Sequence, residues 1–210
     1  MTVLAHDWYR GGIPANVVLG RDVYVDTAYS FAPFFSEEEQ ALVMGEASGA
    51  YDRTAFVVGA RGRVTVGAYT VLNATTLVCN DRISIGAHCL LAWGSVVTDT
   101  WPDAGASPEA RRRALAAAAA DPHRRLPPVS PPRPVTLEDN VWIGFDAVIL
   151  PGVTIGRGAV IGCKTIVREN VPPYAVVAGD PARILRTLDP DDTEEARLRA
   201  LRDHGHDHAR

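Results

Sequence analysis

Apolar residues recur along the second half of the chain at an interval of six. The interval is unbroken through a run of aliphatic side chains: Leu137, Ile143, Ile149, Ile155, Ile161 and Val167. Two positions before each of these lies another apolar or small residue: Val135, Val141, Ala147, Val153, Ala159 and Thr165. A helix repeats its apolar positions every 3.6 residues and a half-buried strand every two. The pattern therefore predicts neither an ordinary helix nor an ordinary strand.

A coil with three flat sides accounts for a period of six. Each side is one short strand, the aliphatic residue points inward, and glycine or another small residue lets the chain turn the corner. Glycine directly follows three of the aliphatic residues, at Gly144, Gly156 and Gly162. Stacked coils pair their strands about 4.8 Å apart, so the aliphatic side chains form continuous inner ladders. The sequence thus predicts an all-β solenoid.

The same period is present earlier in the chain, with interruptions. We expect inward-pointing residues with one extra residue before the fourth of them: Val66, Leu72, Val78, Ile85, Leu91 and Val97. Residues 17–26 resemble an entry coil, followed by an irregular insertion over about 27–56. Despite these interruptions, we expect residues 1–186 to form a single domain. A polar tail follows over residues 187–210 and is expected to contain a short helix.

An excursion over residues 99–134 separates the two blocks of coils. It contains "SPEARRRALAAAAAD", in which Ser107 is a plausible N-cap, Pro108 suits the first helical position and Glu109 favours the positive end of the helix dipole. Asp121 precedes a proline and is expected to end the helix. The excursion is therefore predicted to carry one helix.

Composition narrows the class of protein. The 210 residues are 47% hydrophobic with a net charge of -4, a balance that argues against a nucleic-acid or membrane-surface partner. The first ten residues lack the pattern of a signal peptide. Three cysteines without metal-type spacing suggest reduced thiols in a cytoplasmic protein, and no metal site is expected.

Residues 135–185 resemble the C-terminal coils of hexapeptide-repeat acyltransferases. Their motifs "DNVWIG", "ILPGVTIG" and "AGDPARIL" are similar almost position by position to those of the sugar and xenobiotic O-acetyltransferase branch. The likeness covers roughly residues 64–186 and is most specific in its C-terminal half. It implies a left-handed parallel β-helix and a homotrimer. It also implies that acetyl-CoA binds between adjacent subunits and donates its acetyl group to a small acceptor, without a metal or a covalent acyl-enzyme.

The resemblance also assigns residues to the two substrates by position. The residues expected to line the CoA groove are Trp142, Phe145, Cys163, Arg168 and Arg183. Arg183 could reach a CoA phosphate by paired hydrogen bonds. On the acceptor side, the expected residues are Asn73, near where the branch has an acceptor-binding asparagine, together with Asp99 and Trp101.

Members of the branch leave the first block of coils with His-Pro, and that histidine takes the acceptor's proton. Here the stretch "TDTWP" has Trp101 at that position, and an indole nitrogen only donates hydrogen bonds. Trp101 is therefore not a base, although it could close the groove or stack on an acceptor. Two substitutes are considered, His123 in the excursion and His88 at a coil corner beside the break.

Other candidates for the base are weaker. Asp99 and Asp103 flank Trp101, but a carboxylate with an ordinary pKa is a poor base at neutral pH unless burial raises that pKa. Three histidines alternate in the polar tail, where solvated side chains are the usual case: His204, His206 and His208.

Two functions remain open. The first is transfer of an acyl group from acyl-CoA to a hydroxyl or amine of a small, sugar-like acceptor. The alternative is a non-catalytic trimer that binds CoA or a glycan or serves as a scaffold, which Trp101 favours. A zinc carbonic anhydrase would need three converging histidines, whereas the coils supply only His88. A sugar-nucleotide transferase would need a nucleotide-binding domain before the coils, and residues 1–63 contain no phosphate loop.

Overall fold

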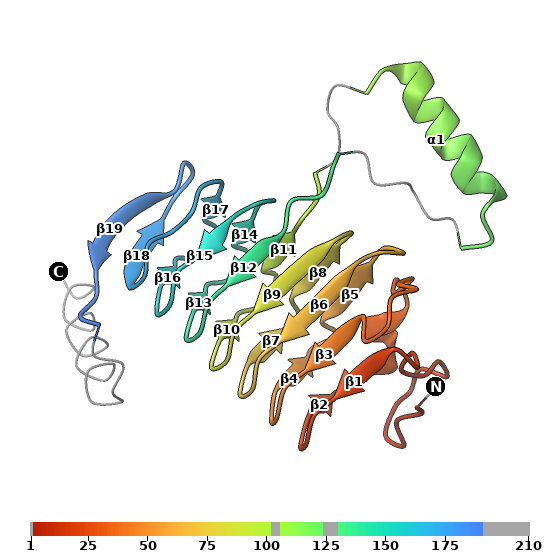
Figure 1. The fold of residues 1–210 in the computed structure, drawn as a ribbon, viewed down its shortest axis with the longest axis horizontal. Helices are drawn as coiled ribbons and strands as arrows, with labels where there is room; N and C mark the ends of the chain where they lie inside the picture. Colours follow the sequence, from red (N-terminus) through yellow and green to blue (C-terminus); the bar gives the residue numbers. More distant parts are fainter. Residues whose placement is uncertain (1, 102–105, 124–129, 191–210) are drawn as a thin grey trace.

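The computed structural model describes residues 2–101, 106–123 and 130–190, which build a solenoid with three flat faces (Figure 1). The chain visits the first, second and third face in turn and then begins the next coil. Neighbouring strands within each face pair in parallel, apart from β18 and β19, which are antiparallel. The predicted all-β architecture of stacked, three-sided coils is confirmed.

The three faces are sheets of short strands. In the described residues, the first face holds β1 (Val17–Leu19), β3 (Leu42–Met44), β6 (Arg63–Val66), β9 (Arg82–Ile85), β12 (Val135–Leu137) and β15 (Thr154–Ile155). The second holds β2 (Tyr24–Val25), β4 (Gly49–Tyr51), β7 (Val71–Asn73), β10 (Leu90–Leu91), β13 (Trp142–Ile143), β16 (Val160–Ile161), β18 (Ala175–Ala178) and β19 (Arg183–Thr187). The third holds β5 (Ala55–Val58), β8 (Thr76–Cys79), β11 (Val96–Thr98), β14 (Val148–Ile149) and β17 (Ile166–Val167).

The core is the set of inner ladders that the period of six predicts. Ile143 pairs with Leu91 on one side and with Ile161 on the other, so aliphatic side chains stack continuously along the second face. The six aliphatic residues of the second block are at most 1% exposed: Leu137, Ile143, Ile149, Ile155, Ile161 and Val167. Burying side chains of this size stabilises a fold by about 1.5–3 kcal/mol each, so the ladders supply most of the cohesion between coils.

The prediction of one inward-pointing residue in the first block of coils is wrong. Val78 is only half-buried, and Leu77 instead is fully buried and pairs with Val97. The cause is a short corner, because only five positions separate Leu72 from Leu77 where the next coil has six between Leu91 and Val97. The alternation of inward and outward side chains is therefore shifted by one residue in β8.

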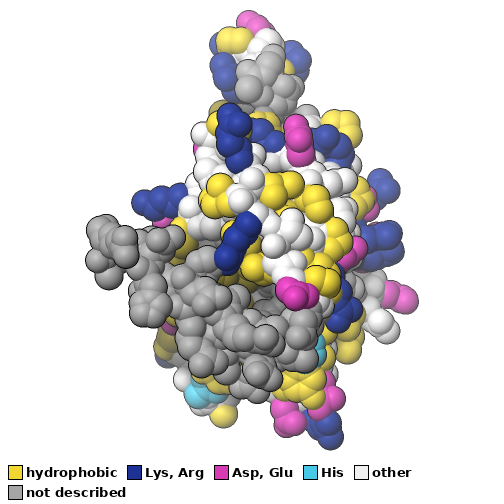
Figure 2. Space-filling view, turned by 90° about the vertical axis from the view of Figure 1, so that its left-hand side faces the viewer, with side chains coloured by type: hydrophobic (Ala, Val, Ile, Leu, Met, Phe, Trp, Pro, Cys, Tyr) yellow, Lys and Arg dark blue, Asp and Glu magenta, His cyan; other side chains and the backbone are white. Residues whose placement is uncertain are grey.

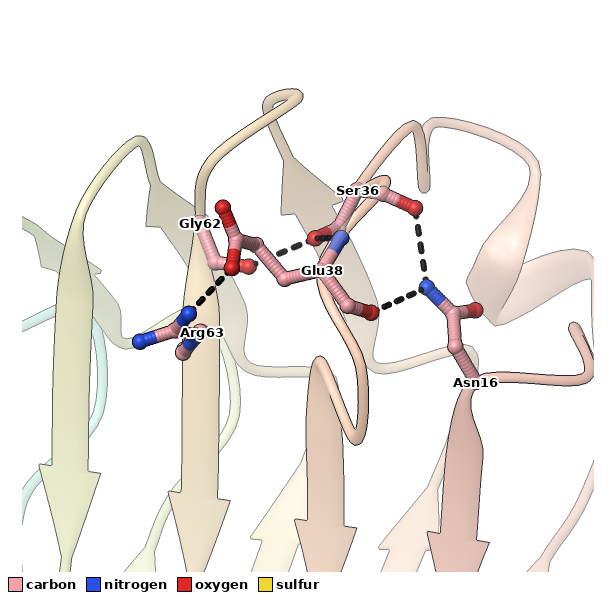
Figure 3. Close-up of polar contacts among 5 residues, drawn as sticks. All are labelled: Asn16, Ser36, Glu38, Gly62 and Arg63. Atoms are coloured by element: carbon pink, nitrogen blue, oxygen red, sulfur yellow. Dashed lines mark hydrogen bonds and ion pairs between the residues drawn. The ribbon is translucent and has the colours of Figure 1, made fainter.

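The irregular insertion expected over 27–56 is shorter than predicted. β3, β4 and the start of β5 lie inside that range and form a regular coil, so only residues 27–41 depart from the solenoid, with a 3-10 helix at Ala28–Phe31. Polar contacts hold this departure against the coils (Figure 3). The Asn16 side chain donates to the backbone carbonyls of Ser36 and Glu38. The Ser36 hydroxyl donates to the Gly62 carbonyl, and the Glu38 carboxylate forms an ion pair with Arg63.

The excursion carries the predicted helix, α1 (Pro108–Ala120), which stands apart from the coils (Figure 1). Ser107 caps it by accepting the backbone N–H of Ala110, and it ends before Asp121, as expected. Only Ala118 of this helix is buried, so α1 packs little against its own chain. The helix expected near residues 194–202 lies outside the described residues, whereas β19 was not expected. None of the described helices is long and apolar enough to cross a membrane.

Candidate functional site

Three aromatic or thiol side chains mark the corner between the second and third faces, called the second–third corner below. Trp93, Phe145 and Cys163 each lie two positions after a core residue of the second face, in successive coils. The rings of Trp93 and Phe145 stack with centroids 5.5 Å apart and planes 12° apart. The backbone N–H of Lys164 donates to the Phe145 carbonyl at 2.7 Å, which holds Cys163 beside Phe145.

Trp142 lies on the second face directly before this corner. It pairs with Leu90 and Val160 in the outward column of that face and is 39% exposed. Phe145 is 47% exposed, and Cys163 is exposed as well. The structure therefore brings together three of the five residues predicted for the CoA groove.

The outer surfaces of the three faces differ in polarity. Outward residues of the second face are mainly apolar and partly exposed: Tyr24, Val71, Leu90, Trp142, Val160 and Val176. Those of the third face are also mainly apolar, with Thr76 among them: Val57, Val78, Val96, Val148 and Ile166. On the first face, the outward column begins with Val18 and Val43 and continues with polar residues: Thr65, Ser84, Thr136 and Thr154. Contiguous exposed apolar surface of this kind usually marks an interaction site.

The two predicted arginines lie near the C-terminal end of the solenoid. Arg168 follows β17 at the rim of a hollow of about 320 Å³ that is lined mainly by apolar residues. Figure 2 shows this end of the molecule, where hydrophobic side chains gather with basic ones among them. Arg168 pairs with Asp180 at 2.5 Å, so an anion bound by Arg168 would replace or share that carboxylate. Arg183 is exposed on β19.

The residues considered for proton transfer are far apart in the fold. Trp101 follows β11, at the corner between the third and first faces, and its backbone N–H donates to the Ser130 hydroxyl. His88 lies at the opposite edge of the first face, after β9, and stacks on Tyr69 with ring centroids 5.2 Å apart.

His123 is placed elsewhere again. Its ring contacts Phe35, with centroids 5.4 Å apart, and the Phe35 backbone bonds to Val58 of β5. His123 therefore lies at the level of β5, whereas Trp101 follows β11, two coils further along the third face. Asp103 and the tail histidines lie outside the described residues, so the described part of one chain does not assemble a complete proton-transfer site.

Asp99 has a structural role that the sequence did not reveal. It is 0% exposed, and its carboxylate accepts the backbone N–H groups of three consecutive residues at 2.7–3.0 Å: Asn80, Asp81 and Arg82. Burial raises the pKa of Asp99, although these donors oppose the shift. Because the carboxylate is buried and occupied, we correct the expectation that Asp99 contacts the acceptor.

Asn73 is the acceptor-side candidate that lies close to the second–third corner. It ends β7, is 9% exposed and belongs to the short corner between Leu72 and Leu77. Tyr51 pairs with it in the preceding coil. The sequence analysis missed Trp93 and Asp52 here, although Trp93 lies two positions after Leu91, as Phe145 does after Ile143. The Trp93 indole N–H donates to the Asp52 carboxylate at 2.6 Å.

The described residues contain no group of three or more His, Cys, Asp or Glu side chains placed to hold a metal ion.

The three cysteines differ sharply in environment. Cys79 and Cys89 are buried, and burial raises the pKa of both thiols, whereas Cys163 is exposed at the second–third corner.

Comparisons with known proteins support the family suggested by the repeats. Residues 134–169 match the family model described as bacterial transferase hexapeptide (six repeats). The chain is 49% identical over 59 residues to galactoside O-acetyltransferase of Escherichia coli K12, which is 28% of this chain and 29% of the relative. It is 49% identical over 55 residues to a chloramphenicol acetyltransferase of Agrobacterium fabrum, 26% of each chain. These matches span little more than a quarter of the relatives' length.

Solved structures extend the likeness along most of the chain. A hexapeptide-repeat acetyltransferase from Vibrio cholerae, in complex with acetyl-CoA, has a TM-score of 0.55 at 27% identity and covers 77% of this chain and 76% of its own. An N-acyltransferase from Bacillus cereus has a TM-score of 0.61 at 17% identity, with 90% of each chain covered, which supports the fold alone.

Proposed function

We propose that this chain, a member of the hexapeptide-repeat acyltransferases, transfers an acetyl group from acetyl-CoA to a hydroxyl or amine of a small, sugar-like acceptor. The observation that carries this proposal is the second–third corner with Trp142, Phe145 and Cys163. These residues lie in the stretch that matches the family model, and their exposed apolar surface suits the pantetheine arm of CoA.

The basic residues near the C-terminal end of the solenoid suit the phosphate-bearing end of CoA. Arg168 and Arg183 would bind its phosphates by charge-assisted hydrogen bonds, with Arg168 exchanging Asp180 for phosphate oxygens. Acetyl-CoA would then extend from the C-terminal hollow toward Phe145. We expect no metal in this reaction, because the thioester is itself reactive toward a positioned nucleophile.

A complete site is proposed to need a second copy of the chain. Trp101, His88 and the Trp142 surface lie on different edges of the solenoid, so a single ligand would contact them only between copies. The apolar outward column of the second face, which includes Leu90, would contact a neighbouring copy in a homotrimer, so that the second–third corner borders the groove between copies. We also propose that the coil is left-handed, as the family resemblance implies.

The transfer step follows from the chemistry of a thioester. The acceptor oxygen or nitrogen attacks the carbonyl carbon, the carbon–sulfur bond breaks, and the acceptor's proton finally protonates the departing CoA thiolate. Trp101 would close the groove over the acceptor instead of moving this proton. His88 or His123 of a neighbouring copy is the proposed base, and an amine acceptor of low pKa would need a base least.

A second function is favoured by one observation, the tryptophan at position 101. Without a base the same assembly would be a non-catalytic CoA- or glycan-binding protein. The two functions are separated by following free thiol release from acetyl-CoA with sugars, aminosugars and small amines. Acceptor-dependent release supports the transferase. CoA binding without release, across all acceptor classes, supports the non-catalytic protein and contradicts the proposed reaction.

A further inference from the structure

The corner after β7 is one residue shorter than the corners of the neighbouring coils. Five positions separate Leu72 from Leu77, whereas six separate Ala50 from Phe56 in the coil before. The short corner removes one position from the column of outward side chains at the second–third corner. Asn73, the last residue of β7, lies at this short corner, and no described residue hydrogen-bonds to its side chain.

Trp93 bridges the short corner. Its indole N–H donates to the Asp52 carboxylate at 2.6 Å, although Asp52 follows β4 and Trp93 follows β10, with β7 between them. A Trp side chain can span two coils only because the intervening corner is short. A hydrogen bond to an ionised acceptor is stronger than a neutral one, so Asp52 fixes the orientation of the indole ring.

Aromatic rings continue on both sides of this bridge. Trp93 stacks on Phe145, and beyond Asp52 the ring of Tyr51 stacks on Tyr24 with centroids 5.0 Å apart. The exposed fractions of Trp93 and Phe145 are 46% and 47%. Large aromatic surfaces that are oriented by hydrogen bonds and remain half exposed are suited to ligand binding.

The charge at the bridge selects among ligands. Within the described ranges, no Lys, Arg or His side chain forms an ion pair with Asp52. Arg53 and Lys164 belong to the same corner column, yet neither pairs with that carboxylate. Aromatic faces attract cations, and an indole that donates to a carboxylate carries a more negative face. A ligand with an ammonium group would therefore satisfy both Asp52 and the rings.

We propose that Trp93 and Asp52 form a subsite that holds the ammonium group of an amine-bearing, sugar-sized acceptor against the exposed rings of Trp93 and Phe145. The inference rests on the proposed function, because Phe145 also belongs to the surface assigned to acetyl-CoA. Asn73, at the short corner between Asp52 and Trp93, would offer its amide to a hydroxyl of the same acceptor. The subsite thus selects aminosugar-like acceptors over neutral sugars.

Three matched sugars test this selection by binding alone. The full-length protein, without acetyl-CoA, is titrated with glucosamine, glucose and N-acetylglucosamine, and binding is followed by ligand-detected NMR. We expect glucosamine to bind about tenfold more tightly than the two neutral sugars. Asp52→Asn keeps an acceptor for the indole and removes the charge, so it should abolish this preference. Trp93→Phe should weaken glucosamine several-fold, and the exposed carboxylate change Asp22→Asn should have no effect.

Binding is measured without turnover, so its outcome is independent of the reaction. Equal binding of the three sugars, or an unchanged preference in Asp52→Asn, would overturn the subsite. A change of molar mass in Asp52→Asn with unchanged glucosamine affinity would show that the corner is a contact between copies, which also overturns it. Selective binding without acetyl transfer to any acceptor would leave the subsite standing and contradict only the proposed function.

Discussion

The carboxylate of Asp99 accepts the backbone N–H of Asp81 at 2.7 Å, which ties the first residue of the excursion to the corner of the preceding coil. Two neighbouring N–H groups, those of Asn80 and Arg82, donate to the same carboxylate. The excursion therefore leaves the solenoid from a fixed point, and Trp101 follows two residues later. This contact determines where the excursion leaves the solenoid.

Replacing Asp99 should destabilise the protein without changing its chemistry. Asp99→Ala removes the acceptor of three partly buried backbone N–H groups, and each costs about 1–3 kcal/mol where no water reaches it, so we expect a loss of about 2–4 kcal/mol in the free energy of unfolding. Thermal and denaturant unfolding measure this loss, with the exposed Asp22→Ala as the control. Unchanged stability would contradict the structural role of Asp99.

Trp101→His tests whether a histidine at position 101, where the resembling acetyltransferases have one, acts as a base in this protein. Trp101 is 51% exposed, so a smaller imidazole fits there without disturbing the core. If the position faces the acceptor, the histidine should raise kcat at least tenfold, since a base contributes typically 10²–10⁴-fold. It should also make kcat rise with pH near the pKa of histidine. An unchanged kcat and a flat pH profile would place Trp101 outside the reaction.

Single alanine variants separate the two histidine candidates. His88→Ala removes a ring stacked on Tyr69, whereas His123→Ala removes one that contacts Phe35. The variant that removes the base should lower turnover by about 10²-fold or more while CoA affinity stays within a factor of two or three. Steady-state kinetics and calorimetric titration with CoA provide these readouts. Wild-type turnover in both variants would mean that neither histidine moves the proton.

The apolar faces predict assembly. Leu90→Glu places a charge in the outward column of the second face, where Leu90 is 39% exposed, and should shift the protein from trimer to smaller species. Thr65→Glu, on the polar first face, should leave the trimer intact. Light scattering coupled to gel filtration gives the molar masses. A monomeric wild-type protein would contradict the two-copy site.

The solenoid could be predicted from the sequence because a coil with three short sides requires an inward-pointing residue at every sixth position. Each aliphatic residue from Leu137 to Val167 must point inward once per face, so a strict interval of six leaves a visible pattern. The first block was harder to predict because its corners vary in length. The short corner before Leu77 moved the inward position away from Val78, and a coil within 27–56 was mistaken for an insertion.

The site was only partly predictable for a related reason. Trp142, Phe145 and Cys163 were assigned to the CoA groove by the family resemblance, and the structure places Phe145 and Cys163 at one corner with Trp142 on the face directly before it. Asp52 and Trp93 meet across a corner that lacks one residue, and their contact depends on three-dimensional closure. The burial of Asp99 likewise depends on backbone donors of another coil, which no motif in the sequence marks.

The proposed function requires that acyl-CoA binds along the corner marked by Phe145 and Cys163. Cys163 is exposed, whereas Cys79 and Cys89 are buried with raised thiol pKa values, so a thiol reagent should modify Cys163 first. The most direct measurement is the rate of Cys163 alkylation by N-ethylmaleimide, followed by mass spectrometry, with and without saturating acetyl-CoA. We expect at least tenfold protection by acetyl-CoA and none by free adenosine. Equal rates under saturating acetyl-CoA would contradict it.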